Sequence, residues 1–150
     1  EIRNYERIID LGNGRGEDGG MPITFGRLME TNDLALTSWN NEEAYSNRHK
    51  GRLIAEDAIE NGKLQFLVGT VDKNGRMAIY KDGILIAEKD DGQPIVNVKR
   101  SSNFLAHSNY CKEDPDFKGI LDDVRVYNYA LSAEEVADLA ASYNYNLPQP

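Results

Sequence analysis

Asp122 is the residue of this 150-residue chain whose setting most favours a chemical role. Alternate side chains of an extended strand share a face, so Asp122 would lie beside Ile120, Val124 and Val126. A carboxylate on an apolar face costs free energy unless it is hydrogen-bonded or holds a cation. Calcium binds six to eight oxygens, mixing carboxylates with backbone carbonyls. Asp122 is therefore a candidate ligand of a structural calcium ion, and a hydrogen-bonded structural aspartate is the alternative.

Two groups of side chains have the chemistry of a carbohydrate site. Such a site needs a flat aromatic face and planar hydrogen-bonding groups, held on loops over a rigid scaffold. The candidates are Trp39, Asn40 and Tyr45, beside the polar stretch 40–51, and His107, Asn109 and Tyr110, after a late predicted strand. We predict that these six residues bind a glycan. The alternatives are a core position for Trp39 and a plain strand position for His107.

Composition and charge indicate one globular domain and argue against several kinds of partner. A chain of this length with 40% hydrophobic and 28% charged residues is typical of one globular domain. The net charge of −8 argues against nucleic acid and anionic membranes as partners, because both are polyanions. No run approaches the roughly 20 apolar residues that would span a bilayer. The single cysteine excludes an internal disulfide.

Strand patterns, regularly interrupted by turn residues, dominate the chain. In the middle, three apolar runs are separated by Asn74-Gly75 and Asp82-Gly83. These pairs are favoured in type I′ hairpin turns, where both central residues need φ > 0, so they predict a three-stranded antiparallel meander. The predicted strands are 5–11, 23–28, 32–39, 64–71, 76–80, 84–87, 103–108 and 117–128.

The hydrophobic period changes from two to 3.6 near the end of the chain. Ser132 is a predicted helix N-cap, Glu135 completes a capping box, and Leu131 can pack against Val136 as a hydrophobic staple. Many short strands with one terminal helix predict an all-β, two-sheet antiparallel jelly-roll sandwich. We assign this domain to residues 1–143 and a linker or tail to 144–150.

Several of these segments resemble the laminin G-like, concanavalin A-like jelly rolls of bacterial modular extracellular proteins. The similar segments are Arg7 to Gly14, Tyr80 to Gly83, Phe117 to Asn128 and Ala130 to Ser132, so the resemblance covers about residues 5 to 141. Members of that family normally begin with one or two further strands. The resemblance therefore implies a jelly roll without its N-terminal strands, which is excerpted, completed by another chain or genuinely shortened. A truncated jelly roll would have an unpaired sheet edge near residues 5–11.

The resemblance also bears on activity. Related laminarinase-type glucanases place a calcium-ligating aspartate at the position that matches Asp122. Their catalytic signature is Glu-x-Asp-x-x-Glu, which supplies two carboxylates about 5 Å apart. The nearest sequence here, Glu88 to Gln93, ends in a glutamine, which cannot act as an acid. We therefore expect a domain without catalytic activity.

We predict a non-catalytic, lectin-like carbohydrate-binding module of a secreted or cell-surface modular protein. Its expected partners are a glycan or polysaccharide and other domains of the same protein, without nucleic acid and without membrane insertion. Calcium is the expected cofactor. Because function resides in sites carried by a fold rather than in the fold itself, the alternative is a protein-interaction, adhesion or spacer domain with no glycan ligand.

Overall fold

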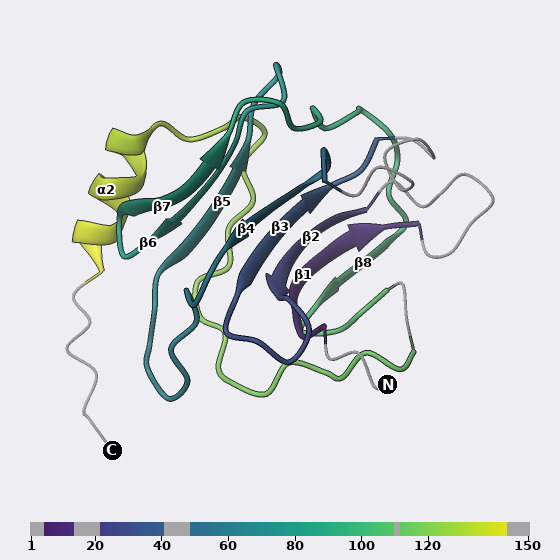
Figure 1. Cartoon of the computed structure of the whole chain (residues 1–150), viewed down its shortest axis with the longest axis horizontal. Helices are drawn as coiled ribbons and strands as arrows, with labels where there is room; N and C mark the ends of the chain where they lie inside the picture. The colour runs from purple at the N-terminus through teal and green to yellow at the C-terminus, as the bar shows by residue number, and fades with distance from the viewer. Residues whose placement is uncertain (1–4, 14–21, 41–48, 110–111, 144–150) are drawn as a thin grey trace.

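The computed structural model describes residues 5–13, 22–40, 49–109 and 112–143. The strands in these ranges form a five-stranded antiparallel sheet in the order β4-β3-β2-β1-β8 and a three-stranded one in the order β5-β6-β7. The elements are β1 (Arg7–Gly12), β2 (Ile23–Arg27), β3 (Leu34–Ser38), β4 (Arg52–Ala55), β5 (Leu67–Val71), β6 (Met77–Lys81), β7 (Ile84–Lys89), β8 (Ser102–Leu105) and α2 (Ala133–Ser142). The sheets face each other as a sandwich (Figure 1), which confirms the predicted fold class.

The main core lies between the two sheets. Phe25, Leu36 and Leu53 of the larger sheet pack with Met77 and Ile79 of β6. Because side chains alternate along a strand, Ala78 and Tyr80 of β6 point to the other side of the smaller sheet. There they pack against the start of α2 in a second cluster, formed by Ala78, Tyr80, Leu131 and Val136. Helix α2 therefore packs on the outer side of the three-stranded sheet, near the β6–β7 turn (Figure 1).

The predicted start of the helix is confirmed. The Ser132 hydroxyl accepts a hydrogen bond from the Glu135 backbone N–H at 3.2 Å, and Glu135 Oε2 accepts the Ser132 N–H at 2.7 Å. Leu131 and Val136 share one hydrophobic cluster, as expected for a staple. None of the helices in the described ranges is long and apolar enough to cross a membrane.

The predicted meander is also confirmed, although its two turns differ. Asp82 and Gly83 have φ values of 52° and 85°, as a type I′ turn requires. In the other turn only Gly75 has a positive φ, of 91°. There Asp72 Oδ1 accepts the N–H groups of Asn74 at 2.7 Å and Arg76 at 2.9 Å and forms a longer loop, so the type I′ prediction for this turn is wrong.

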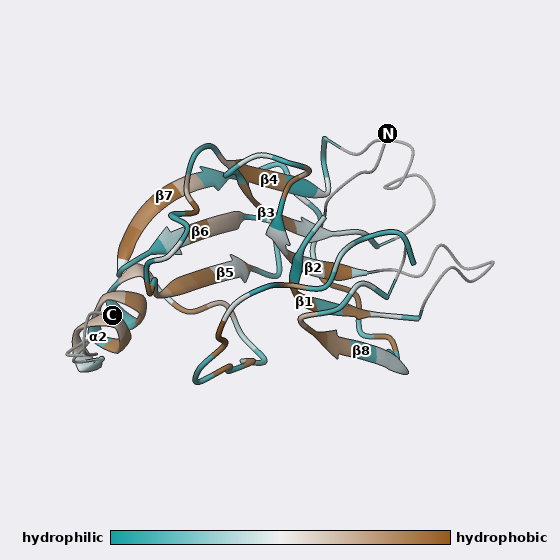
Figure 2. Cartoon of the chain, turned by 90° about the horizontal axis from the view of Figure 1, so that it is seen from below, coloured by the Kyte–Doolittle hydropathy of each residue, from teal (hydrophilic) through white to brown (hydrophobic). Residues whose placement is uncertain are grey.

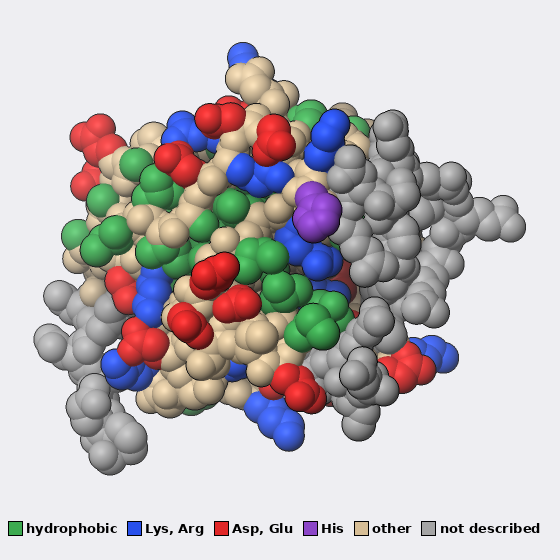
Figure 3. Space-filling view, viewed as in Figure 1, with side chains coloured by type: hydrophobic (Ala, Val, Ile, Leu, Met, Phe, Trp, Pro, Cys, Tyr) green, Lys and Arg blue, Asp and Glu red, His purple; other side chains and the backbone are tan. Residues whose placement is uncertain are grey.

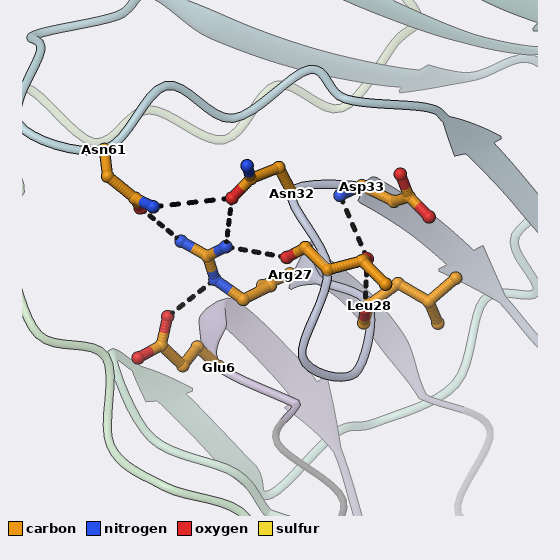
Figure 4. Close-up of polar contacts among 7 residues, drawn as sticks. Glu6, Arg27, Leu28, Asn32, Asp33 and Asn61 are labelled. Atoms are coloured by element: carbon orange, nitrogen blue, oxygen red, sulfur yellow. Dashed lines mark hydrogen bonds and ion pairs between the residues drawn. The ribbon is translucent and has the colours of Figure 1, made fainter.

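Arg27 joins three parts of the chain at one end of the larger sheet (Figure 4). Its guanidinium donates to Glu6 Oε2 at 2.9 Å, to Asn32 Oδ1 at 2.9 Å and to Asn61 Oδ1 at 2.7 Å. A further 2.7 Å bond reaches the Thr31 carbonyl. The planar fork of arginine allows all these bonds at once, so Arg27 holds the β2–β3 turn against both the start of β1 and the loop before β5.

Two predictions about the sheets are wrong. β1 pairs with β2 on one side and β8 on the other, so residues 5–11 do not form an unpaired edge. The segment 117–128 forms no strand, although it has the composition of one. The larger sheet extends past the smaller one, with β1 and β8 lying beyond the level of β5 (Figure 2). The chain between β8 and α2 runs beyond β5, on the side away from β6.

Candidate functional site

A row of mostly polar side chains crosses all five strands of the larger sheet. Directly paired residues of antiparallel strands share a face, so the strand registers place one residue from each strand in line. From β8 to β4 these residues are Phe104, Asp10, Thr24, Thr37 and Arg52, which we call the polar row. The core residues Phe25 and Leu36 are their neighbours along β2 and β3 and point to the opposite side. The polar row therefore lies on the outer face, turned away from the smaller sheet.

The middle of the polar row is buried. Asp10, Thr24 and Thr37 are 0%, 5% and 3% exposed. Asp10 Oδ2 accepts the Asn109 backbone N–H at 3.0 Å and lies 3.7 Å from Arg7 Nε. Within the described residues Asp10 Oδ1 has no hydrogen-bond partner. Burial raises the pKa of Asp10 above its ordinary 3.8, while the Asn109 N–H and the Arg7 charge oppose the shift.

Arg7 connects Asp10 with a second buried carboxylate. Arg7 Nη2 lies 3.6 Å from Asp114 Oδ2. The same oxygen of Asp114 accepts the Ser108 hydroxyl at 2.8 Å. These contacts hold Ser108 and Asp114 beside Arg7. They also supply the pairing and hydrogen bonds that a buried carboxylate needs.

The β8 end of the polar row is open to solvent. The Phe104 ring, 40% exposed, stacks edge-to-face on the His107 imidazole with centroids 5.2 Å apart. His107 Nδ1 lies 2.6 Å from Asp116 Oδ1, and both side chains are exposed. An aromatic ring, an imidazole and a carboxylate thus meet at the free edge of the sheet. We call these three residues the edge site.

The other end of the polar row is closed. Trp39 is 9% exposed and lies under the Arg52 guanidinium, 5.7 Å from the ring centroid. Its indole packs on Gly51, where an added Cβ would lie 2.2 Å from Trp39 Cδ1. The Asn40 N–H donates to Gln93 Oε1 at 3.3 Å. Trp39 is therefore a packed residue of the outer face rather than an open platform.

The structure divides the predicted sugar-binding residues between the two ends of the polar row. Trp39 and Asn40 follow β3, which lies three strands from β8, a sideways spacing of about 14 Å at the usual strand separation. The strand registers also place His107 and Trp39 at opposite ends of these strands. Asn109 lies near His107 and is half-buried, with its side-chain amide donating to the Ser102 carbonyl at 2.9 Å. The two remaining candidates, Tyr45 and Tyr110, lie outside the described residues.

Asp122 does not occupy the apolar strand face that its sequence setting predicts. It is exposed, and so are Ile120 and Val126 beside it, because this segment is not packed into a sheet. The neighbouring Asp123 pairs with Arg125 through two 2.7 Å hydrogen bonds and also accepts one from Tyr143. The described parts of the chain contain no group of three or more His, Cys, Asp or Glu side chains that could hold a metal. Calcium binding at Asp122 stays a prediction.

Phe104 and Asp116 were not among the residues predicted from the sequence. Phe104 lies inside a predicted strand, where an aromatic residue indicates packing, and only the edge position of β8 exposes it. Asp116 belongs to the turn-like run Asp114-Pro115-Asp116, which carries no binding signature. What pointed to this part of the chain was the closeness in sequence of two hydrogen-bonding residues, His107 and Asn109, to the aromatic Tyr110.

Comparison with known proteins places the chain in a family. Residues 3–137 match the family described as the concanavalin A-like lectin/glucanases superfamily. One similar solved structure is an S-layer domain-containing protein from Clostridium thermocellum, with 18% identity and a TM-score of 0.47. That match covers 91% of this chain and 63% of the solved one, so the chain spans less than two thirds of its length. The comparison with curated proteins finds no significant match. Because the family match covers most of its residues, the chain belongs to the concanavalin A-like lectin/glucanase superfamily.

Proposed function

We propose that this chain is a non-catalytic glycan-binding module and that the edge site contacts the sugar. The observation that carries this proposal is the exposed Phe104 ring held against His107, whose Nδ1 is 2.6 Å from Asp116. An aromatic face can receive the C–H groups of a sugar ring, and the imidazole and carboxylate can bind its hydroxyls. Family membership supports a carbohydrate ligand without identifying one. The proposed setting is a secreted or cell-surface modular protein.

The positions of the carboxylates support binding rather than hydrolysis. A retaining glycosidase needs two carboxyl groups about 5 Å apart, on either side of an accessible sugar bond. Asp10 and Asp114 both contact Arg7, but they are 0% and 8% exposed. Glu88 and Asp90, which come closest to the glucanase signature, both pair with Arg76, at 2.5 Å and 3.5 Å. Each of these carboxylates is paired with an arginine of the chain, and none is placed as a retaining glycosidase requires.

Affinity electrophoresis in gels containing laminarin, mannan or xylan tests the proposal. We expect one polysaccharide to retard the native chain, and His107→Ala and Asp116→Asn to migrate faster in that gel. Asp90→Asn is the matched control, because Asp90 is 90% exposed just after β7 of the other sheet and should leave the retardation unchanged. Equal retardation of the native chain and all three variants would show that the sugar binds outside the edge site. If no polysaccharide retards the native chain, the interaction or spacer function becomes the better account.

A further inference from the structure

The hydrogen bond inside the edge site determines which atoms it leaves for a ligand. His107 Nδ1 lies 2.6 Å from Asp116 Oδ1. An ionised carboxylate can only accept, so Nδ1 carries the proton and the neutral imidazole keeps Nε2 as an acceptor. The Asp116 side chain is 74% exposed and has a second oxygen, while the Phe104 ring has no polar atom. The edge site therefore presents hydrogen-bond acceptors beside an aromatic ring.

Two cross-links bracket this imidazole–carboxylate pair. At one end the Phe117 backbone N–H donates to the Ala106 carbonyl at 3.0 Å. At the other end the Ser108 hydroxyl donates to Asp114 Oδ2 at 2.8 Å, and both of these residues are buried. Each member of the pair lies between the two cross-links in sequence. The acceptors are therefore placed before a ligand binds, which lowers the cost of ordering them.

The charges behind the edge site are paired with one another. The Arg7 side chain is 14% exposed and lies 3.7 Å from Asp10 Oδ2 and 3.6 Å from Asp114 Oδ2. Its single positive charge thus faces two carboxylates, and Asp116 adds a third in front of them. An anionic ligand at the edge site would bring a further negative charge next to these groups, and solvent would screen the repulsion only in part.

We infer that the edge site selects neutral glycans and discriminates against acidic ones. This inference rests on the proposed glycan-binding function. The hydroxyls of a neutral sugar can donate to His107 Nε2 and to the Asp116 carboxylate while a C–H face lies on Phe104. A carboxylate or sulfate group in the place of such a hydroxyl has no hydrogen to donate and is repelled by Asp116. The ligand class is therefore a neutral polysaccharide with free hydroxyls.

Nitrogen NMR tests the acceptor at Nε2 without any glycan. The chain has two histidines, so His49 gives a second set of imidazole signals in the same spectrum. At mildly alkaline pH, we expect the nitrogen chemical shifts of neutral His107 to show the proton on Nδ1. This preference should weaken in Asp116→Ala, which removes the acceptor. A neutral His107 with its proton on Nε2 would overturn the inference, because Nε2 would then be a donor.

Matched derivatives of one polysaccharide test the selectivity. Hydroxyethyl and carboxymethyl groups, attached to laminarin, mannan or xylan at equal substitution, differ in charge but little in size. Isothermal titration calorimetry at mildly alkaline pH gives the Kd of each derivative. We expect the native chain to bind the hydroxyethyl form of at least one polysaccharide about tenfold or more tightly than its carboxymethyl form.

Two variants separate the local charge from the overall charge. Asp and Glu side chains are spread over much of the face shown in Figure 3, and the net charge of −8 repels a polyanion wherever it binds. Asp116→Asn and Asp90→Asn each remove one carboxylate, but Asp90 is 90% exposed just after β7 of the other sheet. Asp116→Asn also introduces a donor. It should reduce the preference for the hydroxyethyl form by about threefold or more, and Asp90→Asn should keep the native preference.

The possible results distinguish the selectivity from the glycan binding itself. A native chain that binds both derivatives equally, or prefers the carboxymethyl form, would overturn the selectivity and leave the proposed function intact. Equal loss of preference in Asp116→Asn and Asp90→Asn would do the same, because the overall charge would then explain it. A native chain that binds neither derivative of any of the three polysaccharides would count against glycan binding, and the selectivity would be lost with it.

Discussion

Arg27 Nε donates a 2.9 Å hydrogen bond to Glu6 Oε2, across the strand pair on which the larger sheet is built. Both side chains are mostly buried, with 17% and 20% exposure. The same guanidinium binds the β2–β3 turn and Asn61 in the loop before β5 (Figure 4). Arg27 thus connects segments that are far apart in sequence and holds them together at one end of the larger sheet.

Arg27→Lys should destabilise the fold by about 1–2 kcal/mol, because lysine keeps the charge but cannot reach all these acceptors at once. Urea unfolding measures the change. The control is Arg76→Lys, since Arg76 is 54% exposed and solvent screening leaves its pair with Glu88 with little effect on stability. If both variants lose the same stability, the shared contacts of Arg27 have no special weight.

Gly51→Ala should move the Trp39 indole. The new Cβ would lie 2.2 Å from Trp39 Cδ1 and 2.7 Å from the Ser38 carbonyl oxygen, so the ring or the strand must shift. Overpacking of this kind costs about 1–3 kcal/mol. Trp39 is the single tryptophan, so fluorescence reports on this position alone, and we expect its emission to move to longer wavelength.

The control for that variant is Arg27→Lys, which loses stability without touching the indole. An emission spectrum of Gly51→Ala that matches the native one would show that Trp39 does not pack on Gly51.

Asp10 should make the native chain less stable as pH rises. Burial raises the pKa of Asp10 in the folded chain above the 3.8 of an exposed aspartate. The folded state then holds this proton more tightly than the unfolded state. Its favourable contribution is complete below an unfolded pKa of about 3.8 and is lost as pH rises through the raised folded value.

Urea unfolding at a series of pH values, for the native chain and Asp10→Asn, isolates this contribution. The asparagine does not titrate, so the native chain should lose stability relative to the variant as pH increases through the acid range. Parallel curves for the two proteins would contradict the raised pKa.

The calcium prediction for Asp122 is tested by the melting temperature. A cation that binds only the folded chain raises its stability by mass action. The prediction therefore expects calcium to raise the Tm of the native chain and to leave that of Asp122→Asn unchanged. Equal Tm values of the native chain in calcium and in EDTA would remove Asp122 as a ligand.

Local signals account for the elements that the sequence predicts well. The capping box at Ser132 and the turn at Asp82-Gly83 involve neighbours in sequence, so their residue types determine the geometry. β4 was missed because its four residues follow a long polar stretch and are too short to show a period. The segment 117–128 was predicted as a strand but forms none, because residues that favour strands form one only where a partner strand is available.

The candidate site is formed by contacts between residues that are distant in sequence, which local sequence patterns do not predict. His107 was identified from its side-chain chemistry, but Phe104 joins it because β8 pairs with β1 and forms the free edge of the sheet. The polar row joins residues from five strands through the register of each pair, which the sequence alone does not specify. Trp39 was a reasonable candidate by residue type, yet the close approach of Gly51 and Arg52 buries it.

A glycan array, probed with the native chain and with Phe104→Ala, tests most directly whether the edge site binds sugar. Ile84→Ala serves as the control, because it removes an exposed hydrophobic side chain from the other sheet. The proposal predicts that one class of glycan binds the native chain and the control variant, and that Phe104→Ala loses this signal. Binding that survives Phe104→Ala, or a folded native chain that binds nothing on the array, would contradict it.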